Sequence, residues 1–305
     1  TSSKSGRNEE QIYAVLNTSC ERRTTMMFKG GNIFNASFDV FANDYHSVRP
    51  GYPDSLFEDI RNQCGIDDSS SLLEIGAGSG IATVGLAKLG CHIVAIEPGA
   101  HLIAIARKQT EKFKNVEIFE ETFENFQPSN KFDVILAFTA FHWLSEGDRY
   151  QQILNLLKSY GSLVLVWNSF FQSDLPVTVD INNAYNEFLP DIYPEKSSVA
   201  DVNEGVLSKL NRREQEIVAN PLFYPVFLRK YLTTYSYDDQ TYPKLLNTFP
   251  KIVEIEEEKR SRFLERIAEI IKRHGKISVP VLTTLIICQG KNCFLEIMAN
   301  PKGGI

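Results

Sequence analysis

The 305-residue sequence is poor in the residues that metal and redox sites use. Its cysteines are scattered, with no C-x-x-C pair, and its five histidines show no ligand spacing. Isolated cysteines of this kind are typical of reduced thiols, so neither a disulfide framework nor a metal site is expected. These features favour a cytoplasmic protein without a bound metal. The five cysteines are Cys20, Cys64, Cys91, Cys288 and Cys293.

Long apolar runs and excess positive charge are also missing. No run approaches the ~20 residues of a membrane span, and residues 1–17 lack the basic-then-apolar order of a signal peptide. Lys and Arg total 32 against 38 Asp and Glu, a formal charge of −6. That balance argues against a general nucleic-acid-binding surface. We therefore expect neither a membrane nor a nucleic acid as partner, while the oligomeric state is left open.

The pattern that is present lies in residues 71–100. Residues 71–75 form an apolar run without alternation, as expected of a strand buried on both faces of a parallel sheet. Three alternating glycines follow, where missing Cβ atoms let a ligand lie against backbone N–H groups. A helix and a second strand come next, and that strand ends at Glu97, whose carboxylate could bind a ribose diol. The pattern predicts a nucleoside-binding βαβ unit.

The glycine spacing separates two kinds of nucleoside site. A dinucleotide site requires G-x-G-x-x-G, but here the third position of that motif is Ile81 and the sequence reads G-x-G-x-G. Glu74, two residues before Gly76, would repel a pyrophosphate but could meet a cationic amino acid. The combination resembles motif I of the class I S-adenosylmethionine-dependent methyltransferases, E/D-x-G-x-G-x-G. A dinucleotide site and a glycine turn without a ligand are the alternatives.

The resemblance implies S-adenosylmethionine as the cofactor. Glu74 would act near its amino group, the glycine loop would pack on its methionine and ribose parts, and Glu97 would take both ribose hydroxyls. Family members often read the adenine edge with G-D-A-E, whereas residues 121–124 here are E-T-F-E, so the adenine contact departs from the pattern. The cofactor-binding residues implied in this way are Glu74, Gly76, Ala77, Gly78, Gly80, Glu97, Pro98, Thr122, Phe123 and Ala137.

Two further segments resemble small-molecule methyltransferases of the type 11 kind, which include trans-aconitate methyltransferase. Residues 41–53 match the A-x-x-Y…R-P-x-Y-P segment of that group, and residues 141–143 are the F-H-W that follows a strand at 132–138. For each segment the alternative is simple packing of the loop on the sheet. The resemblance implies Tyr45, Arg49 and His142 as catalytic residues, and His142, Trp143 and Tyr52 as substrate-binding residues.

The chemistry of the acceptor decides what His142 and Arg49 do. A hydroxyl acceptor must lose a proton, and an imidazole could take it as a general base. A carboxylate needs no base, and Arg49 could hold it in a two-pronged pair while His142 orients it. The expected function is O-methylation of a small-molecule carboxylate or hydroxyl, with the carboxylate favoured. Protein methylation and cofactor binding without turnover are the alternatives.

Strands and helices alternate through residues 71–168, which predicts an α/β, doubly wound, mostly parallel sheet. A β-branched run at 281–289 is typical of a last, antiparallel strand, and the resemblance implies seven strands in all. An aromatic-rich stretch with weak helical patterning follows the fifth strand and is predicted to be a helical cap over the crevice. The expected domains are an N-terminal arm at 1–40, a cofactor-binding core at 41–168, the helical cap at 169–222 and the C-terminal part of the core sheet at 223–305.

Periodicity and capping residues predict the limits of the helices. Asp54 and Ser145 are the predicted N-caps of the helices that follow them. The predicted helices used below cover residues 54–64, 81–89, 145–160, 179–189, 201–210 and 254–274.

Overall fold

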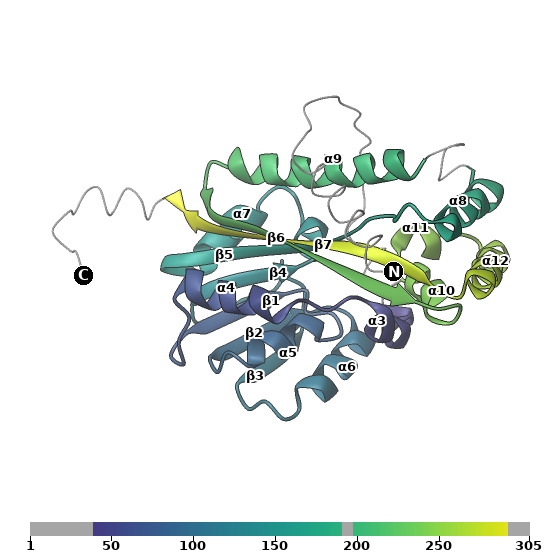
Figure 1. Ribbon diagram of the computed structural model, residues 1–305. Helices are drawn as coiled ribbons and strands as arrows, with labels where there is room; N and C mark the ends of the chain where they lie inside the picture. Colours follow the sequence, from purple (N-terminus) through teal and green to yellow (C-terminus); the bar gives the residue numbers. More distant parts are fainter. Residues whose placement is uncertain (1–38, 191–197, 292–305) are drawn as a thin grey trace.

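The computed structural model describes residues 39–190 and 198–291 (Figure 1). Its centre is a seven-stranded sheet in the order β3-β2-β1-β4-β5-β7-β6. Strands β1 to β5 run parallel, while β7 is antiparallel to both of its neighbours. The predicted doubly wound, mostly parallel sheet is therefore confirmed. The strands are β1 (Ser71–Ile75), β2 (His92–Glu97), β3 (Val116–Glu120), β4 (Phe132–Phe138), β5 (Leu157–Phe170), β6 (Phe223–Tyr237) and β7 (Ile277–Gly290).

Helices cover both faces of this sheet. On one face, α4 (Asp54–Cys64) and α5 (Ile81–Ala87) bury apolar side chains against β1 and β4. On the other face, α7 (Arg149–Leu156) and the end of α9 (Val199–Val218) pack against β4 and β5. The remaining helices are α3 (Ala42–Val48), α6 (Ala100–Thr110), the 3-10 turn η1 (Phe141–Trp143), α8 (Pro176–Phe188), α10 (Thr241–Leu246), α11 (Pro250–Val253) and α12 (Glu257–His274).

The predicted helix at 145–160 is too long at both ends. Ser145 does not cap it, because the Ser145 hydroxyl donates to the Glu124 carboxylate at 3.1 Å and the helix begins only at Arg149. At the other end Leu157 is extended and pairs with Phe132, so the chain has already entered β5. The predicted cap at Asp54 is also wrong, since Pro53 holds that position and Asp54 is the first helical residue.

Two helices of residues 169–222 differ in what they contact. α8 packs on α12, with the ring of Tyr185 4.9 Å from that of Phe263. α9 runs across β5, β7 and β6 on the face opposite α4 and α5 (Figure 1). It extends to Val218, eight residues beyond the predicted end at 210, and starts with a capping box in which Ser198 and Asp201 bond each other's backbone N–H. That these helices act as a cap stays a prediction.

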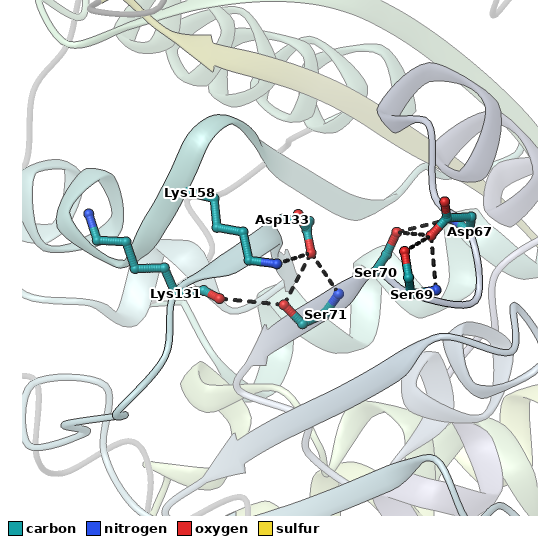
Figure 2. Close-up of polar contacts among 7 residues, drawn as sticks. All are labelled: Asp67, Ser69, Ser70, Ser71, Lys131, Asp133 and Lys158. Carbon is teal, nitrogen blue, oxygen red and sulfur yellow. Dashed lines mark hydrogen bonds and ion pairs between the residues drawn. The ribbon is translucent and has the colours of Figure 1, made fainter.

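Hydrogen bonds fix the amino ends of the parallel strands (Figure 2). The Asp133 carboxylate accepts from the Ser71 N–H at 2.8 Å and from Lys158 at 2.7 Å, which joins the starts of β1, β4 and β5. Just before β1, the Asp67 carboxylate accepts from Ser69 and Ser70. Because this polar cluster lies at the amino edge, the opposite, carboxyl edge is the one available to a ligand.

The predicted domain limits reach beyond what is described. The N-terminal arm at 1–40 lies outside the described residues except for 39 and 40, as do the last residues of the part predicted at 223–305. Within the described residues, every helix is too short or too polar to cross a bilayer.

Candidate active site

A cavity opens at the carboxyl edge of β1, β4 and β5. Its walls come from α3 and the turn after it, from the glycine loop that follows β1, and from the ends of β4 and β5. Part of each predicted set thus meets in one place: Glu74, Gly76, Ala77 and Gly78 of the predicted cofactor residues, and Tyr45, Arg49 and Tyr52 of the predicted catalytic and substrate-binding residues. The lining residues are Tyr45, Arg49, Pro50, Tyr52, Glu74, Gly76, Ala77, Gly78, Ser79, Ile81, Ala82, Phe138, Thr139, Asn168 and Phe170.

The glycine loop has a backbone that other residues adopt only with strain. Gly76, Gly78 and Gly80 all have positive φ angles, of 70°, 56° and 83°. A Cβ on Gly76 would lie 2.6 Å from the Ala140 Cβ, and one on Gly80 would lie 3.0 Å from the Cα of Ala106. A Cβ on Gly78 would meet nothing within 4 Å, so this residue faces open space. A side chain at Gly76 or Gly80 would therefore collide with the protein itself, whereas the open space at Gly78 leaves room for a ligand. We call this loop the cradle.

Glu74 is a buried acid that faces this cradle. Its residue is 1 % exposed, and neither carboxyl oxygen has a hydrogen-bond partner among the described residues. Burial raises the pKa of Glu74 to about 8, the nearby Thr83 hydroxyl opposes this rise, and the charge of Glu97 adds to it. The Thr83 hydroxyl lies close enough to influence the carboxyl group but does not meet the geometry of a hydrogen bond to it. A buried polar atom without a hydrogen-bond partner destabilises the protein. The two unpaired carboxyl oxygens of Glu74 therefore favour a cationic ligand that can donate hydrogen bonds to them.

Glu97 lies at the end of β2 with its carboxylate already engaged. It accepts hydrogen bonds from the Gly78 N–H at 3.0 Å and from the Gly99 N–H at 2.9 Å. Burial raises the pKa of Glu97, and these two bonds oppose the rise. The carboxylate therefore joins the glycine loop to the start of α6, and its remaining lone pairs are the ones that a diol could use.

Arg49 lines the cavity near the end of α3. Its Nε donates to the Thr248 hydroxyl at 2.9 Å and its Nη2 to the Thr248 carbonyl at 2.7 Å. The guanidinium lies 4.5 Å from the ring centre of Phe249 and 5.0 Å from that of Tyr45. No carboxylate within residues 39–190 and 198–291 forms an ion pair with it. Burial lowers the pKa of Arg49, yet a guanidinium stays cationic at neutral pH.

Tyr52, Thr139 and Asn168 form a further part of the wall, and the last two are not among the predicted site residues. The Tyr52 ring packs edge-on against Phe138 at 4.9 Å, and its hydroxyl lies 3.4 Å from the Thr139 hydroxyl. Thr139 has a φ of 55°, which is strained for a β-branched residue and is often found at functional sites. Asn168 donates to the carbonyls of residues 50 and 51 and so ties the α3 turn to β5.

His142 and Trp143 lie outside this set of lining residues. Both are in η1, three or four residues past Thr139, with ring centres 4.7 Å apart. His142 is an exposed residue. Neighbouring protein atoms keep water from part of the imidazole, which lowers the pKa of His142, and the positive charges of Arg213 and Arg149 lower it further. The structure therefore does not bring His142 together with Tyr45 and Arg49 in the cavity wall.

The other predicted cofactor residues are spread around the loop. Ala77 lines the cavity, and Pro98 is half-buried between Glu97 and Gly99. Phe123 and Ala137 are buried in the apolar core under the sheet. Thr122 is half-buried, with its N–H bonded to the Glu121 carboxylate at 2.9 Å. Any role of Thr122, Phe123 and Ala137 in cofactor binding stays a prediction.

The site fits S-adenosylmethionine by two independent features. The orphaned carboxyl group of Glu74 matches an ammonium, and the space in front of Gly78 matches a ligand that lies against the backbone. Glu97 stands where a ribose diol would meet the end of β2. Glu74, Gly76, Ala77, Gly78 and Glu97 are the residues that would hold the cofactor.

Comparison with known proteins decides the family. Residues 72–161 match the family described as "Methyltransferase domain". The chain is 34% identical over 137 residues to a "Putative methyltransferase" of Dictyostelium discoideum, covering 44% of this chain and 49% of that protein. It is 30% identical over 152 residues to a malonyl-[acyl-carrier protein] O-methyltransferase of Bacillus anthracis, covering 48% and 54%. The chain carries a class I S-adenosylmethionine-dependent methyltransferase domain.

A solved structure agrees with this fold. The methyltransferase domain resembles "a Putative Type II Methyltransferase from Anaeromyxobacter dehalogenans", with a TM-score of 0.52 and 20% identity over 79% of this chain and 97% of that one. The chain spans about half the length of the curated relatives that it matches. The predicted family, fold class and cofactor are confirmed, whereas no comparison tests trans-aconitate as the acceptor.

Proposed function

We propose that the protein transfers a methyl group from S-adenosylmethionine to a carboxylate oxygen of a small molecule. The observation that carries this proposal is Arg49, a half-buried cation on the cavity wall whose side chain, among the described residues, donates its hydrogen bonds to the neutral Thr248. A cation held in this way has no anionic partner among the described residues and favours an anionic ligand.

The residues of the chain divide the work between the two ends of the cavity. Glu74 binds the ammonium of the cofactor. The backbone of the loop at Gly78 packs against the cofactor, and the Glu97 carboxylate binds its ribose. S-adenosylmethionine, when bound, supplies an electrophilic methyl group on a sulfonium. Arg49 orients the acceptor carboxylate, and the aromatic rings of Tyr45 and Phe170 exclude water. Catalysis is then mainly alignment in a water-poor site, which needs no acid or base.

The position of His142 favours a carboxylate over a hydroxyl acceptor. A hydroxyl would need a base, but His142 is an exposed residue that is not among those lining the cavity. The relative from Bacillus anthracis, named for O-methylation of a malonyl group, supports the same choice. A malonyl group ends in a carboxylate.

Methyl-tritiated S-adenosylmethionine incubated with the protein and a cell extract tests the proposal. After separation, label should enter the small-molecule fraction and be released by mild base, because a methyl ester hydrolyses there and an ether does not. The Arg49→Lys variant should label this fraction more slowly.

Other outcomes would overturn the proposal. Label in the protein fraction would indicate protein methylation. Base-stable label would indicate a hydroxyl acceptor. Absence of label from a protein that binds S-adenosylhomocysteine would indicate cofactor binding without turnover.

A further inference from the structure

The turn that carries Arg49 depends on other parts of the chain for its hydrogen bonds. Arg49 is extended, with a φ of −68° and a ψ of 137°, and residues 50–53 belong to no helix or strand. Backbone carbonyls in such a segment need donors from elsewhere. Here the donors are side chains of β5 and β6. We call residues 48–52 the Arg49 turn.

Asn168 at the cavity end of β5 supplies donors to the middle of the Arg49 turn. Its Nδ2 donates to the carbonyl of Pro50 at 3.4 Å and to that of Gly51 at 3.3 Å. Its Oδ1 accepts a hydrogen bond of 2.6 Å from the Thr283 hydroxyl. If the amide were turned over, its oxygen would face two carbonyl oxygens and lose all three bonds. The Thr283 hydroxyl therefore fixes the orientation in which Asn168 holds the turn.

Thr283 acts on this network from inside the sheet. It lies directly opposite Asn168 in the antiparallel pair of β5 and β7, and it is 2 % exposed. Thr283 is not among the residues that line the cavity. An effect of its hydroxyl on a ligand in the cavity must therefore pass through Asn168.

Two tyrosines of β6 hold the backbone on either side of Arg49. The Tyr237 hydroxyl donates to the Val48 carbonyl at 3.1 Å, and the Tyr235 hydroxyl donates to the Gly51 carbonyl at 3.4 Å. With both sides held in this way, loss of the Asn168 donors should shift the Arg49 turn rather than release it. The expected effect is thus a displaced guanidinium in a folded protein.

We infer that Asn168 and Thr283 are positioning residues, which set the place of the Arg49 guanidinium on the cavity wall through the backbone of the Arg49 turn. The consequence for the acceptor rests on the proposed function, in which Arg49 binds a carboxylate. The positioning itself does not depend on turnover, so it can be measured in the protein alone.

Nuclear magnetic resonance of the full chain tests the positioning without a reaction. The Nε–H signal of Arg49, assigned by its loss in Arg49→Lys, reports the bond that Nε donates to Thr248. Thr283→Val keeps the shape of the side chain but removes the hydroxyl, so it should shift this signal and speed the exchange of its proton with water. Thr283→Ser keeps the hydroxyl and should leave the signal near its wild-type position.

Thr284 provides a matched control in the same strand. It is 1 % exposed, and its hydroxyl has no hydrogen-bond partner among the described residues. Thr284→Val should therefore leave the Arg49 signal unchanged. Asn168→Ala removes the donors directly and should shift the signal as Thr283→Val does, which keeps the test decisive even if Thr283→Val fails to fold.

Steady-state kinetics measure the consequence for the acceptor that the labelling experiment identifies. Thr283→Val should raise the acceptor KM by about three- to tenfold and leave the affinity for S-adenosylhomocysteine unchanged. In the Arg49→Lys background the same change should have almost no further effect, because a residue that acts through Arg49 then has no guanidinium to position.

Three results would overturn the inference. They are an unchanged Arg49 signal in folded Thr283→Val and Asn168→Ala, an equal shift in Thr284→Val, and an equal rise in KM on adding Thr283→Val to the wild type and to Arg49→Lys. If the signal shifts as expected but Arg49→Lys leaves the acceptor KM unchanged, the proposed function fails while the positioning stands.

Discussion

Glu74 and Glu97 lie at the ends of the neighbouring parallel strands β1 and β2, and only Glu97 has hydrogen-bond donors among the described residues. The charge of Glu97, added to burial, keeps the pKa of Glu74 raised, so Glu74 is largely protonated at neutral pH. A cation next to Glu74 would lower this pKa and favour the ionised carboxylate. The pair therefore couples cofactor binding to the release of a proton, and this coupling can be measured.

The first prediction concerns stability and pH. The pKa of Glu74 is about 8 in the folded chain against 4.5 when unperturbed, so its stabilising contribution is complete below pH 4.5 and is lost as pH rises through 8. Glu74→Gln does not titrate, and its free energy of unfolding relative to wild type should rise by about 3 kcal/mol between pH 5 and pH 8. Urea unfolding at both values measures this. The exposed Glu111→Gln should show no such trend, and parallel wild-type and Glu74→Gln profiles would contradict the prediction.

The second prediction concerns the glycine loop. Gly76→Ala forces a Cβ to 2.6 Å from that of Ala140 at a positive φ, so it should lower the free energy of unfolding by about 2–3 kcal/mol and weaken cofactor binding. Gly78→Ala has no such clash and should keep more stability while still losing cofactor affinity. Thermal melts and calorimetry give both quantities. Gly205→Ala, inside α9 with nothing within 4 Å, should instead stabilise by about 0.5–1 kcal/mol. Equal losses at residues 76 and 205 would be inconsistent with the loop geometry.

The third prediction separates acceptor binding from cofactor binding. Arg49→Lys keeps a charge but loses the forked contact, so the acceptor KM should rise by about tenfold or more while the affinity for S-adenosylhomocysteine stays the same. Thr248→Val removes the acceptor for Nε, together with the bond that the Thr248 hydroxyl donates to the Leu245 carbonyl, but keeps the carbonyl that accepts from Nη2. It should have a smaller effect in the same direction. Steady-state kinetics on a carboxylate acceptor provide the comparison. A parallel loss of cofactor affinity in Arg49→Lys would show that this residue has a general structural role.

The fourth prediction concerns His142. Loss of a general base would lower kcat by ~10²–10⁴-fold. Because a carboxylate needs no base and His142 does not line the cavity, His142→Ala should reduce kcat by less than about tenfold. The pH profile of kcat should keep its shape in the variant. A hundredfold drop, rescued by added imidazole, would make His142 the base and the acceptor a hydroxyl.

Local patterns made the βαβ unit predictable. The run at 71–75, the glycines of the loop and Glu97 are read from short stretches of sequence, and the structure places them as expected. The helix predicted at 81–89 is too long, because α5 ends at Ala87 with Lys88 as its C-cap, and Gly90 takes its positive φ of 89° only beyond that end. The strongly amphipathic α12 was equally clear, although it begins at Glu257 rather than at 254. These features depend on neighbours in the sequence, which is why the sequence predicts them.

Other features depend on residues that are far apart in the chain. Arg49 binds Thr248, 199 positions away, and no local signal announces that bond. Thr139, with its φ of 55°, donates its N–H to the Val166 carbonyl at 2.7 Å, and nothing in the sequence near residue 139 announces that conformation. The contact between His46 and Ser79 at 3.1 Å, which ties α3 to the glycine loop, likewise needs the folded chain. Ser198 and Asp201 did carry a readable capping box, which would have given the start of α9.

Calorimetric titration of S-adenosylhomocysteine into the full chain at pH 7, repeated in buffers of different ionisation enthalpy, tests the central claim most directly. If Glu74 receives the cofactor ammonium, the wild type should release about one proton on binding, and Glu74→Gln should release none. NAD should not bind. Binding of S-adenosylhomocysteine with no proton release by wild-type protein, or failure of the folded chain to bind it at all, would contradict the claim.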